Sequence, residues 1–343
     1  MKRLFLLSAI AIIAICSSSC GSSQSGAPAK PEPPVRQGWY GGPLYGDVES
    51  VTMTNYQLED KFGEIVRGDI ENCEKYYFNE AGDVIEYVQY NSDGSLREKK
   101  TYKYDASRNL VEKAYYNSDG SLDNKHTYKY DALGNMIEEA QYNSDGSLLE
   151  KETYKYDALG NEIECAWYNS AGSLLEKNTY KYDALGNEIE WAWYNSAGSL
   201  RGKETYKYDS SGNEIESASY NSAGSLRNKT IDKYDSAGNL IEYAQYNSAG
   251  SLRYKKTYKY DSVGNMIEYA WYNSDGSLDN KHTYKYDALG NVIELASYES
   301  DGSLDRKIVA KYDSSSNIIE ATSYSGEALV PHSQTVFEIT YRN

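Results

Sequence analysis

The residues with the most chemical potential are large aromatic side chains that recur at two positions of a 26-residue period. Six of them are candidates for ligand binding: Trp167, Trp191, Trp193, Tyr243, Tyr269 and Trp271. Other copies place Cys165, Ser217, Ser219 and Gln245 at these two positions, within a frame that otherwise changes little. Flat aromatic rings beside Glu and Asn suit stacking against sugar rings. The alternative is that these side chains only fill a curved face.

Residues typical of catalytic or metal sites are few. His126 and His282 lie 156 residues apart, six periods, within identical sequence, which indicates duplication rather than catalysis. His332 has no recognisable partner. The turn Asn-Ser-Asp-Gly-Ser faintly resembles a calcium loop, but Ala replaces its Asp in four equivalent turns. No nucleophile elbow, phosphate loop or zinc-protease motif occurs. We therefore expect no enzymatic activity, no metal site and no cofactor.

The composition narrows the class of protein. The chain has 343 residues, a formal net charge of −16, and 37 Tyr against 4 Phe. This acidity argues against a nucleic-acid partner, because phosphate binding needs a basic surface. Beyond the N-terminus, no apolar run approaches the ~20 residues of a membrane-spanning helix. The abundance of Tyr is unlike a disordered chain, since such chains are poor in aromatic residues.

The N-terminus has the pattern of an export signal. Lys2 and Arg3 precede an apolar stretch from Leu4 to Ile15, and three Ser lead into Cys20. This arrangement resembles the lipobox of bacterial lipoproteins, with Ser17 where Leu is usual. The resemblance implies acylation of Cys20, which would anchor the chain to a membrane. We expect a lipid-anchored protein of the bacterial cell envelope at the outer membrane; a plain secretory signal is the alternative.

One unit is repeated along most of the chain. The dipeptide Tyr-Asp recurs, with its Asp every 26 residues from Asp105 to Asp313. In the copy at 157–182, two turn signals, Ala-Leu-Gly-Asn and Asn-Ser-Ala-Gly, alternate with segments rich in Tyr, Thr, Ile and Trp. Turns separated by β-forming segments predict hairpins. The fold class we predict is all-β, a repetitive antiparallel β-hairpin array forming one elongated or spiralling sheet.

Alternation along the strands predicts two faces. We expect an apolar-aromatic face of Ile, Leu and Tyr and a charged face of Glu, Lys and Thr. In one copy, Ile163, Cys165 and Trp167 of the first strand would share a side, and in the second strand Leu174, Glu176, Asn178, Tyr180 and Tyr182 would do so. A four-residue loop would set Trp167 opposite Leu174. Pairing Tyr182 with Ile189 would set Lys181 opposite Glu190, and the same Lys–Glu pair would then repeat along the sheet.

Both ends of the array need a cap, because an open sheet edge would recruit another chain. Gly46 to Cys73 contains two β-rich stretches and should form the first cap, and Val336 to Tyr341 should be the closing strand. Residues 20–36 are rich in Ser, Gly, Ala and Pro and should form a tether. The expected organisation is a lipoprotein signal peptide at 1–19, the tether at 20–36, a β cap at 37–75, the repeat array at 76–324 and a capping strand at 325–343.

Two cysteines remain after Cys20. In a flat sheet Cys73 and Cys165 would lie about 30 Å apart, whereas a disulfide needs Cα atoms within about 7 Å. We therefore predict two free thiols.

The strings Tyr-Asp-Ala-Leu-Gly-Asn, Asp-Gly-Ser-Leu and Tyr-Lys-Tyr-Asp resemble the YD or RHS repeats of bacterial surface and secreted proteins. The resemblance covers about residues 76–324. It implies a strip of antiparallel hairpins, which in the large RHS and Tc toxins and in teneurins winds into a hollow shell. It also implies a link to carbohydrate binding. We find no long C-terminal toxin segment and no RHS-type self-cleavage core, which argues against toxin delivery.

The function we expect is that of a non-catalytic cell-envelope lipoprotein that presents a Tyr- and Trp-rich β-surface for binding. Its ligand would be a carbohydrate or a protein, in addition to the membrane reached through Cys20. The first alternative is a purely structural spacer or adhesin stalk. The second is an RHS-type shell associated with toxin delivery.

Overall fold

The computed structural model describes residues 34–326 and 329–342. These residues form 22 β-strands and no helix. The strands are β1 (Val48–Lys61), β2 (Glu64–Phe78), β3 (Val84–Asn91), β4 (Leu96–Tyr104), β5 (Leu110–Tyr116), β6 (Leu122–Tyr130), β7 (Met136–Asn143), β8 (Leu148–Tyr156), β9 (Glu162–Asn169), β10 (Leu174–Tyr182), β11 (Glu188–Asn195), β12 (Leu200–Tyr208), β13 (Glu214–Asn221), β14 (Leu226–Tyr234), β15 (Leu240–Asn247), β16 (Leu252–Tyr260), β17 (Met266–Asn273), β18 (Leu278–Tyr286), β19 (Val292–Tyr298), β20 (Leu304–Tyr312), β21 (Ile318–Ser325) and β22 (Val330–Tyr341). The expected signal peptide, Cys20 and the tether as far as residue 33 lie outside the described residues.

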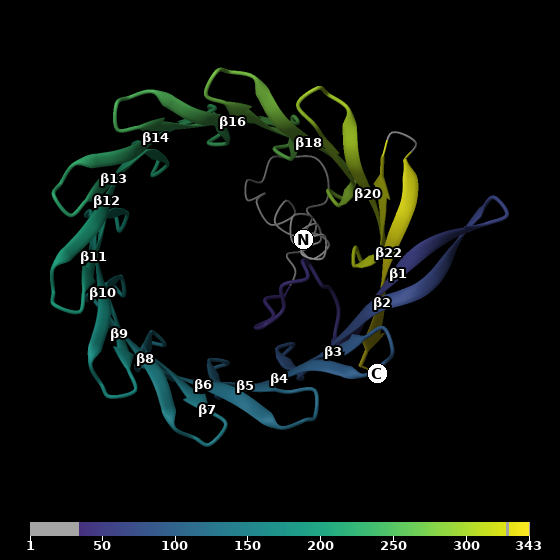
Figure 1. The fold of residues 1–343 in the computed structure, drawn as a ribbon, viewed down its shortest axis with the longest axis horizontal. Coiled ribbons are helices and arrows are strands. Elements are labelled where there is room, and N and C mark those ends of the chain that lie inside the picture. Colours follow the sequence, from purple (N-terminus) through teal and green to yellow (C-terminus); the bar gives the residue numbers. More distant parts are fainter. Residues whose placement is uncertain (1–33, 327–328, 343) are drawn as a thin grey trace.

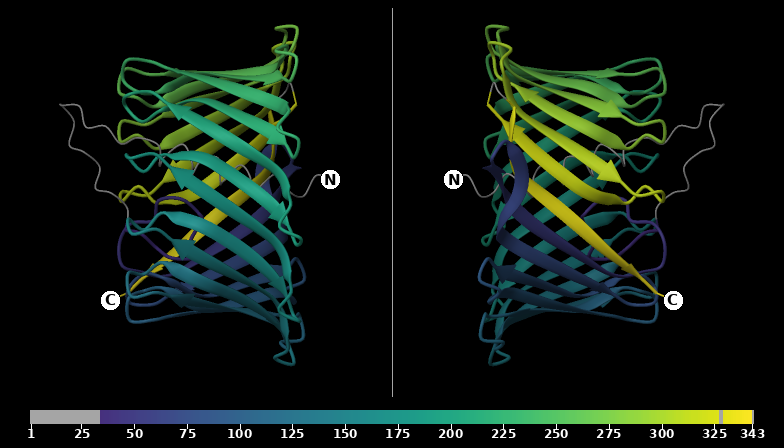
Figure 2. Two further views of the ribbon diagram at one scale, coloured as in Figure 1. Left: turned by 90° about the vertical axis from the view of Figure 1, so that its left-hand side faces the viewer. Right: turned by 90° about the vertical axis from the view of Figure 1, so that its right-hand side faces the viewer.

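The strands form one antiparallel sheet that closes on itself. Each strand pairs with its neighbours in the chain, and β1 pairs with both β2 and β22. The result is a hollow cylinder, seen along its axis in Figure 1, with strands that run obliquely to the axis in Figure 2. For 22 strands about 4.8 Å apart at a typical tilt, the diameter is on the order of 40 Å. The all-β hairpin array is thus confirmed, and its closure is a new finding.

Two kinds of turn alternate along the chain, so they gather at opposite ends of the cylinder. We call the end formed by the turns that follow Tyr-Asp, such as 157–161, the YD rim. The other end, formed by turns such as 169–173, is the NS rim. In the first kind, Asp157 Oδ1 accepts hydrogen bonds from the N–H groups of Leu159 and Asn161, at 2.8 and 2.9 Å. Gly160 has φ of 86°, a conformation that favours glycine.

The charged pairs between strands follow the predicted register. Lys181 lies opposite Glu190, with 2.7 Å between Nζ and Oε1. Glu190 also receives a hydrogen bond from Lys203 on the next strand, again at 2.7 Å. Most copies repeat this arrangement, so a belt of Lys–Glu pairs runs around the cylinder. Opposite charges at such positions contribute about 0.2–1 kcal/mol each.

Two other details of the predicted register are wrong. Leu174 lies opposite Tyr168 rather than Trp167, and Leu175 is an extra, unpaired residue. Tyr182 lies opposite Glu188 rather than Ile189. The reason is a β-bulge beside each turn of the repeats, which inserts one residue and reverses the alternation locally.

The bulges also correct the assignment of faces. Leu174 shares the face of Tyr168, because directly opposed residues lie on the same side of a sheet. Ile163 is the extra residue of its own bulge and is exposed, whereas Cys165 is buried. The aromatic face therefore lacks Ile163 and Leu174, whereas Glu176 lies on it as predicted, opposite Trp167.

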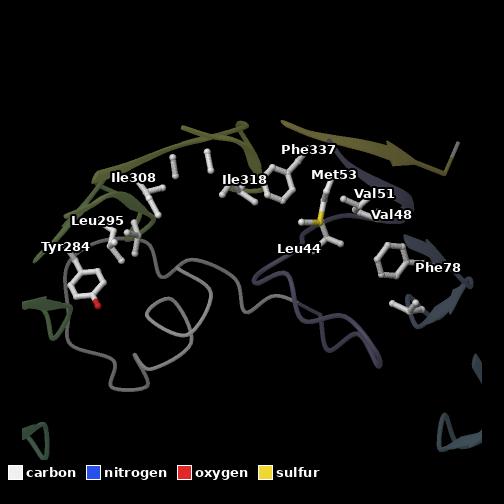
Figure 3. Packing of buried hydrophobic residues seen from close by; sticks show 14 residues of the cluster. Leu44, Val48, Val51, Met53, Phe78, Tyr284, Leu295, Ile308, Ile318 and Phe337 are labelled. Atoms are coloured by element: carbon white, nitrogen blue, oxygen red, sulfur yellow. The ribbon is translucent and has the colours of Figure 1, made fainter. Parts of the chain in front are cut away.

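The two faces of the sheet point into and out of the cylinder. Tyr284, Leu295 and Ile308 lie opposite one another on adjacent strands and project into the cylinder, as Figure 3 shows. Leu295, in the copy that begins at Asp287, is equivalent to Cys165 in the copy at 157–182. The aromatic face is therefore the inner face. The outer face carries the Lys–Glu belt, Tyr residues equivalent to Tyr168, and a row of buried Ala: Ala114, Ala140, Ala166, Ala192, Ala218, Ala244, Ala270 and Ala296.

A compact hydrophobic core lies where the cylinder closes, and it extends onto the adjoining strands β3 and β18–β21. We call this region the seam: residues 34–47, which run inside the ring (Figure 1), together with β1, β2 and β22. Its buried side chains include Leu44, Val48, Val51, Phe78 and Phe337, all at most 5% exposed. The repetitive strands β3–β21 form the rest of the ring, which we call the wall.

Polar contacts hold the N-terminal segment against the seam. The buried Arg36 guanidinium donates to the carbonyls of Leu44 and Gly82. Arg108 takes the place that Gly holds in the repeats, at φ of 66°, and its Nε donates to the buried Asp83 at 2.9 Å. Burial alone would raise the pKa of Asp83, but hydrogen bonds from Arg108 and the Gln37 N–H lower it on balance.

Cys73 and Cys165 are free thiols, as predicted. Burial raises the pKa of the Cys165 thiol to about 12, so it stays protonated and unreactive at neutral pH. The described residues contain no helix long and apolar enough to cross a lipid bilayer.

Candidate ligand-binding surface on the inner face

All six candidate residues lie on the inner face, but the structure divides them between separate groups. Trp191 and Trp193 on β11 lie side by side, with ring centroids 5.0 Å apart. Trp271 and Tyr243 meet in a second group, and Tyr269 belongs to a third. Trp167 lies between carboxylates, opposite Glu152 on β8 and Glu176 on β10.

Space for the Trp191–Trp193 pair comes from a glycine on the adjacent strand. Gly202 lies opposite Trp193, and a Cβ at Gly202 would lie only 2.4 Å from the Trp193 ring. The equivalent positions in neighbouring copies hold Glu176 and Asn228. Any larger residue would therefore displace this indole.

At this pair, two buried polar atoms have no hydrogen-bond partner among the described residues. Trp191 Nε1 is a hydrogen-bond donor and Asn178 Oδ1 is an acceptor, and neither is satisfied by the described residues. Asn178 lies directly opposite Trp193, and Trp191 lies opposite Tyr180 on the same strand as Asn178. Buried polar atoms are nearly always hydrogen-bonded in folded proteins, and exceptions need an explanation. A donor and an acceptor next to two indole rings match a ligand that combines hydroxyl groups with a stacking surface.

The second group surrounds a lysine with aromatic rings. Tyr243, Tyr254 and Trp271 come from three consecutive strands, with successive centroids 5.9 and 5.0 Å apart. Lys256 Nζ lies 4.6 Å from the Trp271 centroid and 5.1 Å from that of Tyr243. Such cation–π contacts hold the ammonium group among the rings.

The third group continues the aromatic surface along the cylinder. Tyr269 stacks between Tyr258 and His282, with centroids 5.3 and 5.7 Å away. His282 Nδ1 lies 2.9 Å from Ser297 Oγ, and burial lowers the pKa of His282. His282 is thus part of the aromatic surface, although its sequence context indicated only duplication. His126 lies 2.9 Å from Glu139, and no group of three or more metal-ligating side chains occurs in the described part of the chain.

One copy interrupts the aromatic inner face. In the copy at 209–234, Ser217 and Ser219 replace the aromatics. Asp232 stands where the copy at 157–182 has Tyr180. Burial raises the pKa of Asp232 to about 6, and its Oδ1 has no partner among the described residues. A hollow of about 690 Å³ opens beside it at the YD rim, lined by residues of the turns at 209–213 and 235–238 and by Asp232 and Tyr234. The inner face therefore has a polar gap between its two aromatic regions.

Sequence reasoning missed half of this surface. The candidates predicted from the sequence all lie on the first strand of a hairpin, so Tyr254, Lys256 and Tyr258 on the second strand were not predicted. The signal was available, because the position of Tyr254 holds Glu176, Gly202, Asn228 and Asn280 in other copies. Both strands of each hairpin thus contribute variable residues to the inner face.

Comparisons with known proteins show similarity only at the level of the fold. No family model and no curated protein sequence matches the chain. Among solved structures, a TcdB2-TccC3 crystal structure is 14% identical to this chain, with a TM-score of 0.33. The match covers 81% of this chain and 20% of the TcdB2-TccC3 chain. A porin-like protein from Bacteroides uniformis is 11% identical, covers 85% of this chain and 98% of its own, and has a TM-score of 0.27. The chain thus spans about a fifth of the first structure, and neither likeness carries functional information.

Proposed function

We propose that this chain is a non-catalytic, lipid-anchored protein of the bacterial cell envelope that binds carbohydrate on the inner face of its cylinder. The observation that carries the proposal is the pair of unsatisfied groups, Trp191 Nε1 and Asn178 Oδ1, beside two adjacent indole rings. A sugar offers hydroxyl groups that both accept and donate, together with an apolar ring face for stacking.

The distribution of variable residues also supports binding inside the cylinder. The outer face repeats the same Glu, Ala, Lys and Tyr residues in copy after copy, whereas the inner face changes between Trp, Tyr, Ser, Gln and Cys. A constant frame with variable inward residues suits a surface with several different subsites. The carboxylates beside the rings favour a neutral or basic glycan over an acidic one. Trp167, for example, lies opposite two Glu residues.

A glycan array probed with residues 21–343 tests the proposal. We expect binding to a defined glycan class, and a loss of at least about tenfold in affinity when Trp191→Ala and Trp193→Ala are combined. The matched control combines Tyr168→Ala and Tyr194→Ala, which remove two outer-face rings from β9 and β11. The control should keep its affinity. Absence of glycan binding, or equal losses in both variants, would favour a spacer or stalk.

The membrane anchor needs its own test. Mass spectrometry of the protein isolated from envelopes should find acyl groups on Cys20 at the N-terminus of the mature chain. The Cys20→Ala variant should leave the membrane fraction. An unmodified Cys20 in a membrane-free protein would contradict the anchor without affecting the glycan test.

A further inference from the structure

The YD rim carries a row of exposed apolar side chains at the tips of its turns. These residues are Leu133, Leu159, Leu185, Val263 and Leu289, each between 56% and 83% exposed. The fold itself holds them outward, because the Leu159 N–H donates to Asp157 and equivalent bonds fix Leu133 and Leu185. They occupy two separate arcs of the ring, between β6 and β11 and between β16 and β19. Apolar tips on two arcs can rest together on a flat surface.

A second apolar row lies just behind these tips. The residue two positions after most YD turns is an isoleucine that is 37–40% exposed: Ile85, Ile137, Ile163, Ile189, Ile241, Ile267 and Ile319. A lysine precedes each turn, and its side chain is 62–68% exposed: Lys103, Lys129, Lys155, Lys181, Lys207, Lys233, Lys259, Lys285 and Lys311. Each of these ammonium groups is paired with a Glu of the outer face. Apolar tips with a layer of paired charges behind them match the layered polarity of a lipid headgroup region.

The NS rim has a different surface. Its turn tips are Ser, Asp, Ala and Gly, as in 91–95 and 169–173. The bulge position beside these turns holds a charged residue in most copies, such as Arg97 or Asp279, and Leu only at Leu149 and Leu175. Phe62 stands apart at the tip of the β1–β2 hairpin. The regular row of exposed apolar turn tips is thus confined to the YD rim.

The first described residues of the chain lie at this same rim. The Val35 carbonyl accepts a hydrogen bond from Arg108 at 3.0 Å, and the Gln37 N–H donates to Asp83. Arg108 and Asp83 both belong to YD turns. Val35 is itself 74% exposed. Cys20 precedes Pro34 by 14 residues, a span of at most about 50 Å when fully extended.

We propose that the YD rim rests on a lipid bilayer, with the five apolar turn tips in contact with the headgroup region. This orientation rests on the proposed anchor at Cys20, which would hold the YD rim rather than the NS rim near the membrane. The open NS rim would then face away from the bilayer and give glycans access to the inner face.

Vesicle flotation tests the contact independently of the lipid on Cys20. Residues 21–343 should float with phosphatidylcholine–phosphatidylglycerol vesicles, and combining L133S, L159S and L185S should lower the partition coefficient at least about tenfold. The matched control, L149S with L175S near the NS rim, should stay within about twofold of the parent chain. Because all five leucines are exposed, thermal melting should show that both variants keep the parent stability.

Two flotation results would overturn the proposal. One is an absence of vesicle binding by the parent chain at millimolar lipid. The other is an equal loss in the two variants. Concentration-dependent dimerisation that the YD-rim variant abolishes would assign this rim to a second copy of the chain, and would also overturn it.

An environment-sensitive fluorophore then fixes the orientation of the lipid-anchored chain. With Cys73→Ser and Cys165→Ala as background, the label is placed through Leu159→Cys on the YD rim or Ala171→Cys on the NS rim. Lipids that carry a nitroxide quencher should quench the first label and leave the second unchanged. Quenching of the second label alone would reverse the orientation and contradict the proposal, whatever the outcome of the glycan array.

Discussion

The seam and the wall are stabilised by different interactions. The seam buries branched and aromatic side chains, such as Val48 and Phe78, and no part of it repeats. In most wall copies the most deeply buried apolar residue is an Ala, and stability comes from ladder hydrogen bonds, Lys–Glu pairs and the rings of Tyr. Away from the seam the wall has no deep core, so an inner residue can change with adjustment of a single opposed residue, as Gly202 opposite Trp193 shows. The buried residues of the seam cannot be changed in this way, and closure of the ring depends on them.

The largest effect we predict is from a charge placed in the seam. Val51 is 1% exposed, so Val51→Asp should lower the free energy of unfolding by more than about 4 kcal/mol in urea titrations. The wall control Ile189→Asp, at a half-exposed bulge, should change it by less than about 0.5 kcal/mol. Similar losses in the two variants would contradict the distinction between seam and wall.

A smaller effect should follow from removing the buried charge of the seam. Asp83→Asn leaves Arg108 without its ion pair and should cost about 2–4 kcal/mol in the same titrations. The pKa of Asp83 is lowered in the folded state, so its contribution is present above about pH 4 and is lost as the pH falls through the folded-state pKa. The stability difference between parent and variant should therefore shrink in acid; a constant difference would contradict this account.

The wall should respond more weakly to loss of one charge. Hydrogen bonds from Lys181 and Lys203 lower the pKa of Glu190, so Glu190→Gln should cost about 0.5–1 kcal/mol, again with the loss confined to higher pH. On the same strand, burial raises the pKa of the inward Glu188. Glu188→Gln should therefore be neutral or stabilising. Opposite signs for these two variants in thermal melts would sharpen the distinction between outer and inner faces, and equal signs would break it.

The smallest effect concerns the polar gap. Because burial raises the pKa of Asp232 to about 6, its charge destabilises the folded state above that pH, and protonation relieves this between about pH 6 and 4. Asp232→Asn should stabilise the protein by less than about 1 kcal/mol at pH 7.5, since Asp232 is only half-buried and solvent screens its charge. The gain should vanish near pH 4. A destabilising effect at pH 7.5 would show that Asp232 has a partner in solution.

Local sequence predicted the wall well because every repeat restates the same local rules. Turn residues such as Gly160 and Asn169 fix the hairpins, and alternation puts Lys181 opposite Glu190. The bulges escaped prediction, because an extra residue such as Leu175 fits the alternating pattern until its partners are known. Of the inner-face residues, the first-strand aromatics were candidates from the sequence, while Lys256 and His282 were not, since their contacts come from neighbours on other strands.

Closure could not be predicted from any single repeat. It depends on the twist and curvature summed over all the strands, to which each hairpin contributes little. It also depends on contacts between residues far apart in the chain, such as the Tyr45 N–H with Asn317 Oδ1 at 2.6 Å. No local pattern encodes a contact across 272 residues.

The central claim is that the variable residues of the wall face the inside of a closed cylinder, and one labelling measurement tests it directly. In a chain with Cys73→Ser and Cys165→Ala, a single thiol is introduced on β12 through Glu204→Cys, on the inner face, or Lys207→Cys, on the outer face. Both thiols are labelled with a short biotin maleimide, and streptavidin is then added. We predict that streptavidin captures the outer label only, because it is too large to enter the cylinder. Equal capture of both labels in the folded protein would contradict the closed cylinder and the binding surface assigned to its inner face.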